Sequence, residues 1–335
     1  MAEIIKPEGY HSVLNLRDTQ VAIKATKDYF ETNLARELRL TRVSAPLFVD
    51  AESGLNDDLS GTERAVAFDV LETGRNLQIV HSLAKWKRYA LKEYGFNCDE
   101  GLYTDMNAIR RDEATDNIHS IYVDQWDWEK VIDKEDRTRE TLKQIVKKIF
   151  SVFKMTEKYI SSLFPQLEAR LPEEITFITT QRLEDMYPDL TAKERELAIA
   201  KEHGAVFIMQ IGDVLASGEK HDGRAPDYDD WELNGDIIFY DNILDIPLEV
   251  SSMGIRVSEE SMRRQLKAAG CEDRAALPFH KDLLAGRLPY TIGGGIGQSR
   301  ICMFFLHKAH IGEVQASAWP EEMREECREN GITLL

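Results

Sequence analysis

The sequence predicts an α+β fold in which helices flank a mixed sheet, and two observations support this. The expected elements run in the order helix, strand, strand and helix, long strand, helix, several strands, helix, without the regular alternation of a parallel α/β sheet. Structured patterns also cover almost all 335 residues, with no fixed-period repeat, low-complexity tract or Pro/Ser-rich linker. We therefore expect one domain over residues 1–335, with 1–18 as an N-terminal extension.

Hydrophobic spacing predicts the first elements. Residues 19–38 predict a helix, because their apolar side chains recur near one face and Thr19 is a candidate cap. Residues 41–49 predict a strand interrupted by Pro46, which cannot donate to a sheet ladder and marks an edge or a bend.

Residues 118–128 alternate strongly and predict a strand with two different faces. The faces hold His119, Ile121, Val123, Gln125 and Asp127 on one side, and Ser120, Tyr122, Asp124, Trp126 and Trp128 on the other. We expect the tryptophans to pack in the core. Arg110 precedes this strand, and an antiparallel return would set Arg110 above the sheet, although a solvated turn is the simpler interpretation.

The remaining elements follow from similar patterns. Strands are expected at 77–83, 176–180, 205–212, 236–240 and 247–257, and helices at 84–95, about 135–163, and 260–270 ending at Gly270. Residues 291–312 predict a glycine-rich turn followed by an apolar helix.

The glycine cluster GGGIGQSR (293–300) is the most conspicuous motif. It is no dinucleotide-binding fingerprint, because Arg300 stands where the third glycine belongs, and it lacks the G-K-[ST] of a P-loop. One interpretation is a turn with a helix cap. The other is a backbone that approaches a ligand closely, with Arg300 in the first helical turn binding a phosphate.

Asp236 and Glu249 lie on two expected strands and are a candidate Mg²⁺ site. Two carboxylates on adjacent strands can share Mg²⁺ and bridge it to phosphate oxygens. Because the chain holds 59 acidic residues, ordinary strand-end acids are the alternative.

Composition excludes several classes of protein. A net charge of −17 disfavours broad attachment to nucleic acid. No apolar run is long enough to span a bilayer, and the N-terminus lacks a signal-peptide core. The four cysteines, far apart and without C-x-x-C, indicate reduced thiols. We expect a cytoplasmic protein that binds neither nucleic acid nor membranes.

Eight stretches, spread over most of the chain, together resemble a known family. They are GLNDDLSGTERAV (54–66), HSLAKWKR (81–88), GLYTDMNAIRRDE (101–113), HSIYVDQWDWE (119–129), RAPDYDDW (224–231), LNGDI (233–237), SSMGIRV (251–257) and TIGGGIGQSR (291–300). Their order resembles the three signature motifs of the class II aminoacyl-tRNA synthetase catalytic core. More specifically, they resemble the ammonia-dependent asparagine synthetases, the aspartate–ammonia ligases built on that core.

The resemblance implies a mostly antiparallel sheet and a two-step reaction. ATP with Mg²⁺ would convert L-aspartate to β-aspartyl-AMP with release of pyrophosphate, and ammonia would then give asparagine and AMP. The implied nucleotide-binding residues are Arg110, Asp229, Asp236, Ile237, Glu249 and Arg300. The implied aspartate-binding residues are Asp57, Ser82, Lys87, Gln125, Asp127, Ser251, Ser252, Arg256 and Gly293. Arg110, Arg300 and Lys87 are the expected catalytic residues, and Asp236 with Glu249 the expected metal ligands.

The resemblance also implies a homodimer, with Pro46 and the helix at 19–38 near the interface. A tRNA synthetase would add an anticodon-binding module, and only about 18 residues precede the first expected helix. A glutamine-dependent synthetase of the amidotransferase type would expose an N-terminal cysteine, whereas residue 2 is alanine.

Three other interpretations stay open at this stage. The first is a synthetase paralogue that adenylates aspartate or a related acid for another acceptor. The second is an inactive synthetase-like regulator or tRNA-mimic binder, although the motif arginines and carboxylates are all present. The third is a nicotinamide-dependent dehydrogenase, which the incomplete glycine fingerprint disfavours.

Overall fold

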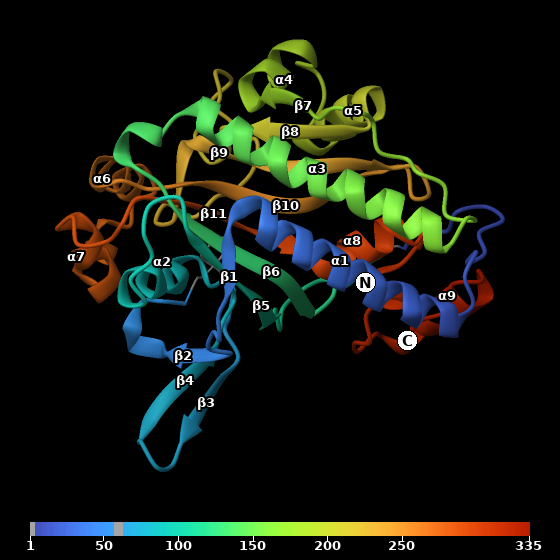
Figure 1. Ribbon diagram of the computed structural model, residues 1–335, viewed down its shortest axis with the longest axis horizontal. Coiled ribbons are helices and arrows are strands. Elements are labelled where there is room, and N and C mark those ends of the chain that lie inside the picture. Colours follow the sequence, from blue (N-terminus) through green and yellow to red (C-terminus); the bar gives the residue numbers. More distant parts are fainter. Residues whose placement is uncertain (1–3, 57–62) are drawn as a thin grey trace.

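The computed structural model describes residues 4–56 and 63–335 and contains an eight-stranded sheet flanked by helices (Figure 1). In spatial order its strands are β1 (Leu40–Arg42), β5 (Gly101–Ile109), β6 (Tyr122–Val131), β11 (Thr291–Gly297), β10 (Ile246–Arg256), β9 (Asp229–Asp241), β8 (Ala205–Met209) and β7 (Thr176–Thr179). The pairs at the two edges, β1 with β5 and β7 with β8, are parallel, and all other neighbours are antiparallel. The mixed, mostly antiparallel sheet is therefore confirmed.

Two long helices, α1 (Leu16–Leu38) and α3 (Arg139–Leu163), run side by side across one face of this sheet (Figure 1). Phe30 of α1 stacks on Trp126 of β6 with ring centroids 4.9 Å apart. Trp126 and Trp128 are fully buried in this core, so the predicted division of the alternating strand is confirmed. The opposite face of β6 is left for polar side chains.

The start of α1 differs from the prediction. The helix begins at Leu16 and not at Thr19, because the Asn15 side chain caps it by accepting a hydrogen bond from the Asp18 N–H at 2.9 Å. Thr19 is buried instead, where its hydroxyl oxygen accepts a hydrogen bond from Lys308 Nζ at 3.0 Å.

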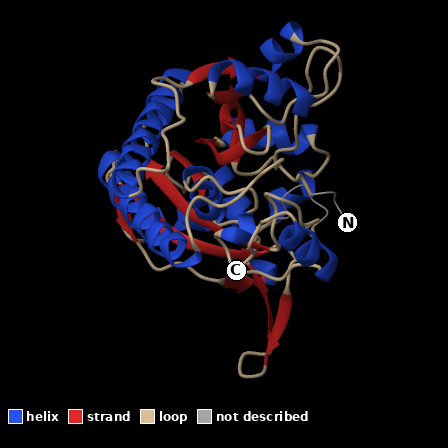
Figure 2. Cartoon of the chain, turned by 90° about the vertical axis from the view of Figure 1, so that its right-hand side faces the viewer, coloured by secondary structure: helices blue, strands red, loops and turns tan. Residues whose placement is uncertain are grey.

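The segment around Pro46 divides between two sheets. The strand predicted over 41–49 is two short strands, β1 and β2 (Phe48–Asp50), with Pro46 between them. The second strand joins β3 (Ala67–Val70) and β4 (Arg75–Ile79) in a three-stranded antiparallel sheet. This small sheet projects from the body of the molecule (Figure 2).

The glycine-rich segment is a central strand and not the predicted turn. β11 pairs with β6 on one side and β10 on the other, in extended backbone. A Cβ at Gly293 would collide with the Glu129 carboxylate and lie 2.7 Å from the Trp128 carbonyl oxygen. Glycine is needed here for close approach of neighbouring groups, and turn geometry plays no part.

Seven further helices complete the described part of the fold. They are α2 (Ala84–Glu93), α4 (Thr180–Met186), α5 (Ala192–His203), α6 (Glu259–Ala268), α7 (Pro278–Leu284), α8 (Gln298–Phe305) and α9 (Glu321–Glu329). The sequence patterns did not predict α4, α5, α7 or α9. Across residues 4–56 and 63–335, no helix is both long and apolar enough to pass through a bilayer.

Candidate active site

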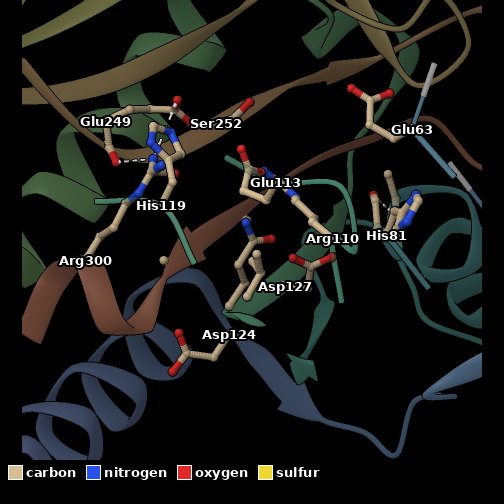
Figure 3. Close-up of a pocket in the computed structure, with 18 of the residues that line it drawn as sticks. Glu63, His81, Arg110, Glu113, His119, Asp124, Asp127, Glu249, Ser252 and Arg300 are labelled. Atoms are coloured by element: carbon tan, nitrogen blue, oxygen red, sulfur yellow. Dashed lines mark hydrogen bonds and ion pairs between the residues drawn. The ribbon is translucent and has the colours of Figure 1, made fainter. Parts of the chain in front are cut away.

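A cavity of about 530 Å³ opens over the sheet face opposite α1 and α3 (Figure 3). Its size suits a small-molecule ligand. Eleven of the residues predicted for the site line it: Ser82, Lys87, Arg110, Gln125, Asp127, Asp229, Glu249, Ser251, Ser252, Arg256 and Arg300. Residues far apart in the sequence thus meet in one place, because β6, β10 and β11 are neighbours and β5 and β9 flank them.

Of the four other predicted residues, three lie outside the lining. Ile237 is completely buried in the main hydrophobic core. Gly293 faces the Glu129 carboxylate beneath the cavity, and its neighbour Gly294 forms part of the lining instead. Asp236 lies behind the lining, bound to Arg224. Asp57 falls outside the residues that the structure describes.

Arg110 enters the cavity from the end of β5. Its backbone N–H donates to the Ile121 carbonyl oxygen at 2.8 Å, which holds the arginine where the return strand begins. The guanidinium lies 3.6 Å from the Glu113 carboxylate, and its buried Nε has no hydrogen-bond partner within residues 4–56 and 63–335. A buried donor without a partner is costly, so this nitrogen is placed to bind a ligand oxygen.

Arg300 reaches the same cavity from the first turn of α8. Its Nη1 donates to the Glu249 carbonyl oxygen at 2.9 Å and lies 3.8 Å from the Glu249 carboxylate. Figure 3 shows the Arg300 side chain extending toward Glu249. The two motif arginines therefore provide two fixed positive charges in one cavity.

A network of buried charges forms the floor. Lys87 Nζ lies 3.1 Å from the Asp127 carboxylate and 3.8 Å from Glu129. Arg256 binds Glu129 through two nitrogens, at 3.0 Å and 2.8 Å, and also pairs with Asp229. Burial alone would raise the pKa of Glu129, but Arg256 and Lys87 hold it below its usual value. Both cations are thus committed to protein carboxylates.

Sequence reasoning did not assign Glu129 a role. Period two could have indicated it, because Glu129 is the next residue after Gln125 and Asp127 on the same face of β6. The completely buried carboxylate also accepts a hydrogen bond from the Thr291 hydroxyl at 2.7 Å. Glu129 is therefore the centre of the floor network.

A glycine of β11 leaves room for polar side chains of the neighbouring strand β6 on the cavity floor. A Cβ at Gly295 would collide with the Gln125 amide oxygen and lie 2.9 Å from the Asp127 carboxylate. The absence of a side chain at Gly295 therefore allows both polar groups to face the cavity. Ser251 Oγ, buried in the same lining, has no hydrogen-bond partner in the described part of the chain.

Arg224 is a lining residue that the motif analysis did not single out. Its Nη2 donates to Asp236 at 2.6 Å, and its Nη1 donates to the Ser252 hydroxyl. Burial raises the pKa of Asp236 to about 6, against the opposing effect of Arg224. Burial would also raise the pKa of Glu249, but Arg300 and Arg224 keep it below its usual value.

Of the two predicted metal ligands, Glu249 is better placed than Asp236 to bind Mg²⁺. Within residues 4–56 and 63–335, no three His, Cys, Asp or Glu side chains gather into a metal-binding cluster. Mg²⁺ bound to a nucleotide needs only one or two protein carboxylates, because phosphates and water complete its shell. Glu249 lines the cavity and meets this need, whereas Asp236 is already bound to Arg224.

Comparison with known proteins gives consistent matches. The sequence model of the family described as "Aspartate-ammonia ligase" matches residues 17–331. The chain is 68% identical over 336 residues to the aspartate–ammonia ligase of Ruminiclostridium cellulolyticum, covering 100% of both chains. It is 65% identical over 333 residues to that of Clostridium tetani, covering 99% of this chain and 98% of the other.

Two solved structures share the fold. Asparaginyl-tRNA synthetase from Pyrococcus horikoshii, complexed with asparaginyl-adenylate, matches with a TM-score of 0.64 at 13% identity, covering 90% of this chain and 70% of that one. The Entamoeba histolytica asparaginyl-tRNA synthetase in complex with asparaginyl-adenylate matches with a TM-score of 0.60 at 12% identity, covering 90% and 66%. At such low identity these matches establish the fold alone.

Proposed function

The chain belongs to the aspartate–ammonia ligase family, which uses ATP to make asparagine from aspartate and ammonia, and we propose that it does so through a β-aspartyl-adenylate formed in the cavity over the large sheet. The observation that carries this proposal is the meeting of Arg110 and Arg300 in one cavity. Two guanidinium groups beside carboxylates suit a nucleotide whose phosphates gain charge as the reaction proceeds.

The proposed nucleotide site extends from Arg110 to Glu249. Arg110 binds the α-phosphate through its Nε, which has no hydrogen-bond partner among the described residues, and Arg300 binds the distal phosphates. Glu249 would hold the Mg²⁺ that accompanies ATP, and the bound metal would supply positive charge beside the phosphates. Asp229 lines this site while it is paired with Arg256, and Asp236 and Ile237 support the site from behind the lining.

The proposed aspartate site occupies the floor near β6 and β11. Asp127 and Asp57 bind the ammonium group of the substrate, and Gln125, Ser82, Ser251 and Ser252 bind its carboxylates. Lys87 and Arg256 contribute positive charge nearby while they hold the carboxylates of the floor in position. Gly293 permits the close strand approach on which this floor depends.

The reaction needs no protein nucleophile. A side-chain carboxylate oxygen of aspartate attacks the α-phosphorus of ATP, and pyrophosphate leaves. The nitrogen of ammonia then attacks the activated carbonyl carbon, loses a proton, and expels AMP. The protein binds and orients the reactants and stabilises the developing charge. We also propose a homodimer, with Pro46 and the exposed side of α1 near its interface.

Product analysis tests the proposal. Protein incubated with ATP, Mg²⁺, L-aspartate and ammonium should yield asparagine, AMP and pyrophosphate in equal amounts. Without ammonium, it should exchange labelled pyrophosphate into ATP only when aspartate is present. ADP with inorganic phosphate as products would contradict the adenylate, and transfer of aspartate to tRNA would favour the paralogue.

A further inference from the structure

Asp124 lies at the N-terminal end of α8 and lines the same cavity as Arg300. We propose that Asp124 is a positioning residue, which fixes the first turn of α8 so that Arg300 projects into the cavity. The inference rests on the proposed role of Arg300 in binding ATP. It concerns a residue for which the sequence predicted only a face of a strand.

The Asp124 carboxylate, which lies on β6, accepts hydrogen bonds from three other segments of the chain. Its Oδ1 accepts hydrogen bonds from the Ser299 backbone N–H at 3.1 Å and from Gln315 Nε2 at 3.2 Å. Its Oδ2 accepts from Lys27 Nζ of α1 at 2.9 Å. Gln315 also donates to the Ser299 hydroxyl at 3.0 Å, so the turn is held through both backbone and side chain. Asp124 itself is only 6% exposed.

Helix α8 depends on the Asp124 carboxylate because its own N-cap residue provides no side-chain cap. The N-cap residue of α8 is Gly297, which has no side chain to accept from the free N–H groups of the first turn. Asp124 supplies the missing oxygen from β6, and its negative charge is favourable beside the positive end of the helix. The backbone N–H of Ser299 is thereby occupied by a protein group.

Arg300 follows Ser299 directly, so the orientation of this turn determines where its side chain begins. Among the described residues, the guanidinium is bound only by the Glu249 carbonyl oxygen, with the Glu249 carboxylate farther away. Figure 3 shows the Asp124 carboxylate well separated from the Arg300 guanidinium. Asp124 therefore acts on Arg300 through the backbone and not by contact.

A double-mutant cycle tests this mechanism, because residues that act through one another show non-additive effects. Asp124→Ala is made in the wild-type chain and in Arg300→Ala. The kinetic constants for ATP are measured by aspartate-dependent pyrophosphate exchange, and stability is measured by urea unfolding. A roughly tenfold fall in kcat/KM for ATP corresponds to about 1.4 kcal/mol of lost transition-state stabilisation. We expect this fall in the wild-type chain, and less than about a twofold change where Arg300 is absent.

Two further variants sharpen the comparison. Asp124→Asn keeps an acceptor oxygen for the Ser299 N–H but loses the negative charge beside the helix end and the hydrogen-bonded ion pair with Lys27. Because the capping oxygen is retained, this variant should recover most of the ATP efficiency. Asp105→Asn is the matched control, because Asp105 accepts at 3.0 Å from the side chain of Gln298 in the same turn but from no backbone N–H of α8. We expect its kcat/KM for ATP to stay within about twofold of wild type.

The outcomes distinguish the positioning role of Asp124 from the proposed nucleotide site. An equal loss from Asp124→Ala in both backgrounds, or no loss in the wild-type chain, overturns the positioning role. If Arg300→Ala alone leaves kcat/KM for ATP unchanged, the proposed nucleotide site fails, and this inference fails with it. If Asp124→Ala does not fold, Gln315→Leu replaces it, with the same expectation that its effect disappears without Arg300.

Discussion

Replacement of Arg110 by alanine separates a catalytic role from a structural one. Among the described residues this arginine makes one ion pair, 3.6 Å from Glu113, with 28% of its side chain exposed. Such pairs contribute about 0–1 kcal/mol to stability, so the free energy of unfolding should change by less than about 1 kcal/mol. In the reaction, loss of a donor to a developing anion costs about 3–4 kcal/mol. We therefore expect kcat/KM for ATP to fall by about 10²–10³-fold at nearly unchanged stability.

Pyrophosphate exchange and asparagine formation measure the activity of the Arg110→Ala protein, and urea unfolding measures its stability. Arg75→Ala is the control, because Arg75 makes a comparable exposed ion pair with Asp50 on the projecting small sheet. That variant should match wild type in both assays. Near-normal turnover of Arg110→Ala would refute its role at the α-phosphate. A stability loss above about 2 kcal/mol would show that Arg110 supports the fold.

Three further predictions test the floor and the C-terminal region. Arg256→Met should destabilise the protein by about 3–5 kcal/mol in urea unfolding, because it removes the nearest cation from the buried carboxylates of Glu129 and Asp229; a loss below about 1 kcal/mol would contradict this. Gly295→Ala should raise KM for aspartate about tenfold with KM for ATP unchanged, because its Cβ displaces the Gln125 and Asp127 side chains; equal changes in both constants would argue against the assignment. Burial lowers the pKa of His310 from 6.5 to about 4, so the unfolded chain binds more protons and stability falls as pH drops from about 6.5 toward 4. His310→Gln should flatten the change in urea midpoint between pH 7 and pH 5, whereas replacement of the exposed His11 should not.

Sequence patterns predicted the parts of the fold that strict periodicity governs. The alternation over 118–128 separated the buried tryptophans from the polar face of β6, because a strand allows only two directions for its side chains. The predicted antiparallel return is also confirmed: β5 pairs antiparallel with β6, and Arg110 at the end of β5 lines the cavity over the sheet.

Patterns failed where long-range packing decides the structure. The glycines at 293–295 suggest a turn by composition, but their role is to let neighbouring groups approach, which only the assembled sheet reveals. The sequence patterns did not identify Arg224 or Asp124 as site residues, because their hydrogen-bond partners lie elsewhere in the sequence. The roles of the predicted site residues remain predictions, and Asp57 lies outside the described residues.

The interlocked charges beneath the cavity restrict how this enzyme can be redesigned. Lys87 and Arg256 each contact two carboxylates, and Glu129 is shared between them. A mutation that alters one member leaves an unmatched ion in a region with little water, and the fold loses stability before selectivity can change. Libraries aimed at other amino-acid substrates should therefore vary opposite charges together, or leave this layer intact and diversify Ser82, Ser251 and Ser252 above it.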